Sequence, residues 1–119
     1  MPAADLQFDG LTLRAILDTG SDSPIILPTE YKDRLVLDAP PTLVGYAVSA
    51  AGKQPIHAAR LKGSVRVGPV AVERPKVYFM DGGRPNVGLP ILRQLRVVYE
   101  ASGRRSWILT EGKALTFGP

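Results

Sequence analysis

Short runs of alternating apolar and polar residues, separated by turn residues, cover most of the chain. Alternation with a period of two is typical of strands that bury one face in a core. The pattern predicts strands over these ranges: Ala4–Phe8, Leu11–Leu17, Pro24–Leu27, two within Leu43–Leu61, Ser64–Val67, Val70–Val72, Pro75–Met80, Arg96–Tyr99, Ser106–Leu109 and Ala114–Phe117. The first two strands flank Asp9-Gly10, a pair that favours a tight type I′ turn because both residues tolerate a positive φ.

Two stretches predict short helices instead. Thr29–Leu35 begins with a residue suited to capping and places the apolar Tyr31 and Leu35 four positions apart, on one helical face. Pro90–Leu95 begins with proline, which the first turn of a helix accepts. The sequence therefore predicts a mostly β fold, a closed or nearly closed barrel with one or two short helices.

Composition is that of one globular domain. The 119 residues, 45% hydrophobic and 22% charged, suffice for one core, so we expect 1–119 to form a single domain. The amino terminus lacks the features of a signal peptide, and no run of 18 apolar residues occurs. We expect no membrane segment and a soluble domain, cytoplasmic or periplasmic, which could belong to a longer anchored protein.

Charge and cysteine content narrow the possible partners. The net charge is +4, but the basic residues are scattered and no basic run exceeds Arg104-Arg105, so nucleic acid is not an expected partner. The chain has no Cys and one His, His57, which excludes disulfides and thiolate metal sites. No metal or other cofactor is expected. Ser49 and Ser106 lack the His-Asp pattern of a serine hydrolase.

The candidate chemistry lies in Asp18–Ser21, Asp-Thr-Gly-Ser, between two apolar strands. An unpaired carboxylate in apolar surroundings is costly, so its position indicates a function. Gly20 permits a sharp turn and leaves room for a substrate, and the Ser21 hydroxyl is able to donate a hydrogen bond to the carboxylate. The alternative is a polar β-turn in which Asp18 and Thr19 only satisfy local amides.

With these residues, the chain resembles the retropepsin-like aspartic proteases, the single-lobed relatives of pepsin found in retroviruses and bacteria. The resemblance covers nearly the whole chain. It rests on the motif at Asp18, on a hairpin centred on Gly52 where the family has its flap, and on Val87-Gly88 followed by a short helix. In the family, an apolar-apolar-Gly element packs beside the catalytic loop.

Two positions depart from the family pattern. Asn86 stands where the family commonly has an apolar residue. Leu89 stands where retroviral members have an Arg that pairs with an acidic residue, whose position is occupied here by Asp22. A role for Asp22 in gripping the substrate backbone therefore lacks its usual partner.

The resemblance implies an acid-protease barrel with one lobe per chain and an aspartic endopeptidase that hydrolyses polypeptides. The family mechanism requires two aspartates and the chain has one such motif, so the implied enzyme is a homodimer. Its two Asp18 carboxylates would share one proton and activate a water. The implied catalytic residues are Asp18, Thr19, Gly20 and Ser21. The implied substrate-binding residues are Asp22, Ala50, Ala51, Gly52, Val87 and Gly88.

A second hypothesis keeps the barrel but not the chemistry. The chain would then be a catalytically silent peptide-binding or dimerisation module in which Asp18 is a relic. The intact motif from Asp18 to Ser21 favours the enzyme.

Overall fold

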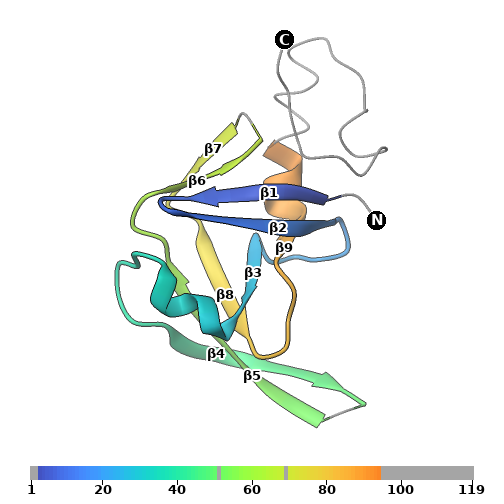
Figure 1. Ribbon diagram of the computed structural model, residues 1–119. Helices are drawn as coiled ribbons and strands as arrows, with labels where there is room; N and C mark the ends of the chain where they lie inside the picture. Colours follow the sequence, from blue (N-terminus) through green and yellow to red (C-terminus); the bar gives the residue numbers. More distant parts are fainter. Residues whose placement is uncertain (1–2, 51, 69, 95–119) are drawn as a thin grey trace.

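The computed structural model describes residues 3–50, 52–68 and 70–94 (Figure 1). Residues 89–94 form a short helix at the end of this part. The other elements, in chain order, are β1 (Ala3–Phe8), β2 (Leu11–Asp18), β3 (Ile25–Pro28), the 3-10 helix η1 (Thr29–Arg34), β4 (Thr42–Ser49), β5 (Gly52–Arg60), β6 (Ser64–Val67), β7 (Val70–Glu73), β8 (Lys76–Met80) and β9 (Asn86–Gly88). The predicted strands Arg96–Tyr99, Ser106–Leu109 and Ala114–Phe117 lie outside the described residues.

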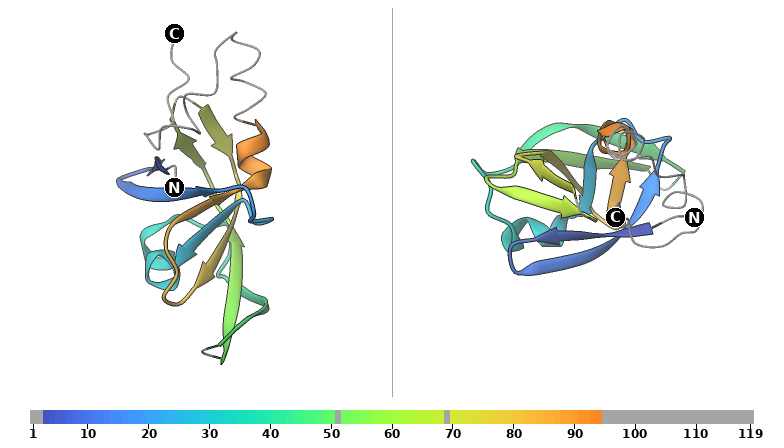
Figure 2. Two further views of the ribbon diagram at one scale, coloured as in Figure 1. Left: turned by 90° about the vertical axis from the view of Figure 1, so that its right-hand side faces the viewer. Right: turned by 90° about the horizontal axis from the view of Figure 1, so that it is seen from above.

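The strands form one sheet in the order β4-β5-β8-β3-β9-β2-β1-β6-β7. The sheet curls into a half-barrel, and the hairpin of β4 and β5 projects from its body (Figures 1 and 2). The mostly β fold that the alternation predicted is therefore confirmed, and so is the single lobe that the resemblance implied.

The core comes from alternate residues of these strands. In β1 and β8, every second side chain is buried, as expected for strands with one face against a core. The side chains of Leu6 and Phe79 are almost completely excluded from solvent. No polar or charged residue in the described part of the chain is fully buried. Any charged group near the core must therefore stand at its edge.

The turn between β1 and β2 differs from the expected type I′. Phe8 pairs with Leu11, so the loop has the two predicted residues. Gly10 has a φ of 75°, but Arg74 is the one non-glycine residue in the described ranges with a positive φ, so the φ of Asp9 is negative. A positive φ at the second central residue alone fits a type II turn, in which glycine takes the position closed to other residues.

The helix η1 lies where a helix was predicted, but its cap was predicted wrongly. The residue before its first turn is Pro28, and no side chain caps the helix. The fixed φ of proline suits this position, so Thr29 lies inside the helix. Tyr31 and Leu35 pack against the core, as their spacing predicted.

Strand β9 was not predicted, and it organises the centre of the sheet. It pairs in parallel with β2, where Asp18 is opposite Gly88, and antiparallel with β3, where Ile26 is opposite Asn86. A three-residue strand gives almost no periodic signal. Its place between β2 and β3 brings residues 86–88 to the loop that follows Asp18.

Candidate active site

Asp18 is the last residue of β2 and is half-buried. The backbone N–H of Gly20 donates to Oδ1 of Asp18 at 2.9 Å, and the N–H of Ser21 donates to the Asp18 carbonyl at 3.2 Å. A side chain at Gly20 would place its Cβ 3.2 Å from Oδ1, so glycine permits this close turn. The carboxylate is therefore partly exposed and held by its own loop, rather than unpaired in apolar surroundings.

The second carboxylate oxygen is held from another strand. The side-chain amide of Asn86, in β9, donates from Nδ2 to Oδ2 of Asp18 at 3.3 Å. Ser21 does not make the bond expected of it. Its Oγ lies 3.4 Å from the carbonyl oxygen and 3.3 Å from the nitrogen of Ser23. The Ser21 hydroxyl thus bonds within its own loop, to Ser23, and Asn86 rather than Ser21 is the side-chain donor to Asp18.

The loop after Asp18 packs directly against Gly88 of β9. A Cβ at Gly88 would lie 1.9 Å from the carbonyl oxygen of Ser23, so only glycine fits. The N–H of Gly88 donates to the carbonyl of Pro24 at 3.0 Å, and that of Leu89 donates to the carbonyl of Ser21 at 2.8 Å. Val87 and Gly88 therefore lie beside the Asp18 loop, as the resemblance to the retropepsin-like proteases implied for this segment.

The remaining loop residues face solvent. Thr19 and Asp22 are both exposed. The ion pairs between described residues join Arg14 to Asp5 and Arg74 to Asp38, and neither includes Asp22. This agrees with the sequence, because Leu89 stands where retroviral members have the Arg that pairs with the acidic residue at this position.

The hairpin predicted as a flap consists of β4 and β5. It projects from the body of the molecule, and its tip lies toward the same side of Figure 1 as the end of β2. Ala50 and Gly52 are exposed and Gly52 has a φ of 114°, which L side chains rarely adopt. Ala51 lies outside the described residues.

An apolar hollow of about 370 Å³ lies between this hairpin and the strands of the body. It is lined by Ser23, Ile26, Val44, Gly45, Tyr46, Ala47, Ile56, Tyr78 and Met80. Ser23 belongs to the loop after Asp18, so the hollow is continuous with that loop. The side chains of Val44 and Tyr46 are about half exposed.

Comparison with known proteins decides the family. The family model described as aspartyl protease matches residues 4–90, well over half of the chain. The chain belongs to the aspartyl protease family. A comparison with curated protein sequences found no match.

Two solved structures share the fold of this aspartyl protease family member. A retropepsin-like aspartic protease from Rickettsia conorii has a TM-score of 0.64 and 19% sequence identity, over 77% of each chain. EIAV protease, determined in complex with an inhibitor, has a TM-score of 0.58 and 14% identity, over 88% of this chain and 90% of that one. The similarity confirms the retropepsin-like fold.

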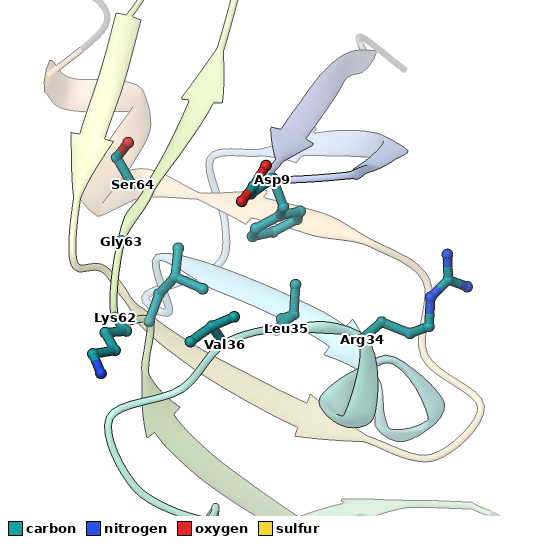
Figure 3. Close-up of a pocket in the computed structure, with 9 residues that line it drawn as sticks. Asp9, Arg34, Leu35, Val36, Lys62, Gly63 and Ser64 are labelled. Atoms are coloured by element: carbon teal, nitrogen blue, oxygen red, sulfur yellow. The ribbon is translucent and has the colours of Figure 1, made fainter.

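A second hollow of this aspartyl protease chain lies apart from the predicted site. It has a volume of about 410 Å³ and is lined by Phe8, Asp9, Arg34, Leu35, Val36, Leu61, Lys62, Gly63 and Ser64 (Figure 3). The side chains of Arg34 and Lys62 extend away from it in opposite directions. None of the residues predicted for the site lines this hollow.

Two further findings concern metals and membranes. Within the described ranges, no three His, Cys, Asp or Glu residues form a group able to hold a metal ion. The same ranges hold no helix with the length and apolar character needed to span a bilayer.

The apolar lining of the first hollow was missed by sequence reasoning. Ile26, Tyr46 and Met80 come from three separate strands, and local pattern does not show that they meet. The sequence held one signal, the alternation of the apolar residues Val44, Tyr46 and Val48 along β4. In the structure of the single chain, all three side chains are exposed. An apolar row on an edge strand suggests a surface that another molecule covers.

Proposed function

We propose that this chain is one subunit of a homodimeric aspartic endopeptidase in which the two Asp18 carboxylates activate a water. The observation that carries the proposal is the partly exposed Asp18 carboxylate at the end of β2, with an N–H donor on each oxygen, in a member of the aspartyl protease family. One chain supplies one such group in the part described. A second copy is therefore the simplest source of the other.

The chemistry follows from two carboxylates placed close together. Like charges at about 3 Å cannot both ionise easily, so the pair holds one proton. The ionised carboxylate takes a proton from the water, whose oxygen attacks the scissile carbonyl carbon, while the protonated one donates to the carbonyl oxygen. When the C–N bond breaks, a proton passes to the leaving amine. The products are a carboxylic acid and an amine.

Substrate would lie extended between the Asp18 loop and the hairpin of β4 and β5, with main-chain hydrogen bonds as in a strand. The exposed Gly52 and the small Ala50 suit a lid that approaches the peptide backbone. The apolar hollow beside Ser23 and Val44 would accept an apolar side chain of the peptide. We thus propose polypeptides with apolar residues near the cleaved bond as substrates.

A comparison of wild type with Asp18→Asn tests the function. Both proteins are incubated with a mixed peptide library and the products are identified by mass spectrometry, while light scattering gives the oligomer size. We expect Asp18→Asn to lower kcat/KM by about a thousandfold or more, because the substitution removes a group that takes part in proton transfer.

Asp9→Asn is the matched control, because Asp9 is an exposed carboxylate in the turn between β1 and β2. It should cleave the library like wild type. Equal cleavage by Asp18→Asn would reject the proposal. Peptide binding by wild type without any cleavage would instead support the catalytically silent module.

A further inference from the structure

Asn86 is a polar residue in an apolar position of the sheet. In β9 it lies opposite Ile16 of β2 on one side and Ile26 of β3 on the other. Its side chain reaches the Asp18 carboxylate, and this hydrogen bond between Nδ2 and Oδ2 is partly buried. The contact joins residues 68 positions apart in the chain.

The other end of the same amide is unsatisfied. Oδ1 of Asn86 is buried and has no hydrogen-bond partner among the described residues. Rotating the amide by half a turn would place Oδ1 against the Asp18 carboxylate and leave Nδ2 without an acceptor. A buried polar atom without a partner lowers stability, and an apolar side chain here would avoid that loss. The advantage of an amide at this position must therefore come from its contact with the Asp18 carboxylate.

The two donors to Asp18 come from different elements. Gly20 holds Oδ1 through the backbone of the loop, and Asn86 holds Oδ2 through a side chain of β9. The Ser21 hydroxyl, which the motif suggested for this task, is directed to Ser23. Donors on both oxygens, from two independent segments, fix the plane of the carboxylate more firmly than the loop alone.

We propose that Asn86 is a positioning residue that orients the Asp18 carboxylate for reaction. The consequence for catalysis rests on the proposed function; the contact itself does not. An amide neither takes up nor releases a proton at working pH. Asn86 therefore orients Asp18 without competing for the proton that the two Asp18 groups share.

The kinetic test uses Asn86→Leu, which keeps the branched skeleton of the side chain and removes the donor. We expect kcat to fall about tenfold or more, because misplacement of a catalytic group by a fraction of an ångström is costly, with KM changed by less than about twofold. The melting temperature should stay level or rise, because the unpaired buried oxygen is gone. Thr12→Val, at the exposed far end of β2, is the control and should match wild type in all three values.

Three outcomes would overturn the proposal. An unchanged kcat would show that the amide is not needed for orientation. A lower kcat with a lower melting temperature would assign Asn86 a structural role. A large rise in KM with kcat unchanged would also overturn it, because the residue would then act on substrate binding.

A second measurement does not depend on activity. Asn86 is the only asparagine in the sequence, so ¹⁵N-asparagine labelling gives one pair of side-chain amide signals. We expect one of the two amide protons to shift as Asp18 titrates and the other to shift much less, with the movement absent in Asp18→Asn.

The two measurements separate the two proposals. If the Asn86 amide signal responds to Asp18 in a protein that cleaves no peptide, the contact is supported and the proposed function is rejected. A signal that does not respond to Asp18 would reject the role of Asn86, even in an active protease.

Discussion

At the residue scale, Gly88 is the described glycine at which an added Cβ would meet its neighbours most closely. An added Cβ would lie 1.9 Å from one backbone oxygen and 2.8 Å from another, those of Ser23 and Ser21. The Ser21 oxygen accepts a hydrogen bond from the N–H of Leu89, and the residue after Ser23, Pro24, accepts one from the N–H of Gly88, so this backbone cannot easily move away. We expect Gly88→Ala to lower the free energy of unfolding by about 3 kcal/mol or more, as measured by urea denaturation.

Gly63→Ala is the matched control for this experiment. Gly63 is exposed, and a Cβ there would meet no atom within 4 Å. Its free energy of unfolding should change by less than about 1 kcal/mol. If Gly88→Ala had the same urea midpoint as wild type, the Asp18 loop would not pack against β9 as closely as the structure shows.

Sequence reasoning found some of these residues and missed others, for a physical reason. The tight turn at Gly20 is encoded within four residues, so the motif was enough to place Asp18 at that turn, while the Gly20 N–H donor was seen only in the structure. The donor from Asn86 depends on a strand pairing far along the chain, and Ser21 appeared able to fill the same role. Local pattern names the groups that can bond to a carboxylate, but the pairing of β2 with β9 decides which one does.

At the element scale, the hairpin of β4 and β5 carries an apolar face that the chain does not bury. The side chain of Val48 is 79% exposed, and Val44 beside the hollow is 49% exposed. An apolar group that is already half in water adds little to the stability of the fold. It can add more to the binding of a peptide that covers it.

Val44→Ser tests this role of the hairpin. We expect KM for peptides with an apolar side chain near the cleaved bond to rise up to about tenfold, because about 1.5 kcal/mol of apolar burial is lost. Both kcat and the melting temperature should change little. Steady-state kinetics on a matched pair of peptides, one apolar and one polar at that position, measures the effect.

Val36→Ser is the control, since Val36 is 65% exposed and lies outside the hairpin. It should leave KM for both peptides unchanged. An equal rise in KM for the two variants, or none for Val44→Ser, would contradict binding at the hairpin.

The elements themselves were largely predictable where the signal is local. Alternation identified the hairpin of β1 and β2 because six residues of β1 pair with six of β2 in unbroken register. The details set by single torsion angles were not predictable: the turn at Gly10 is not type I′, and Pro28 rather than Thr29 precedes η1. Strand β9 was missed because its three residues are too few to show a period.

At the scale of the whole molecule, the described chain leaves its sheet open. Strands β4 and β7 stand at the two ends of the strand order. The Asp18 carboxylate is partly exposed at an edge of the core, and no charged residue in the described part is fully buried. Under the proposed function, which needs two such groups, the site would be complete only when a second copy docks against this one.

Subunit mixing tests this proposal, because a shared site makes an inactive subunit inhibitory. If subunits exchange freely, an equal amount of Asp18→Asn added to wild type leaves about a quarter of the dimers with two intact Asp18 groups, and activity falls to about half. A site contained within one chain would lose nothing. Adding Asp9→Asn instead should raise activity, because every dimer then keeps both groups. Peptide cleavage measured after incubation long enough for exchange decides the matter. Undiminished activity with Asp18→Asn, in a sample where native mass spectrometry of ¹⁵N-labelled wild type shows mixed dimers, would mean that each Asp18 works alone.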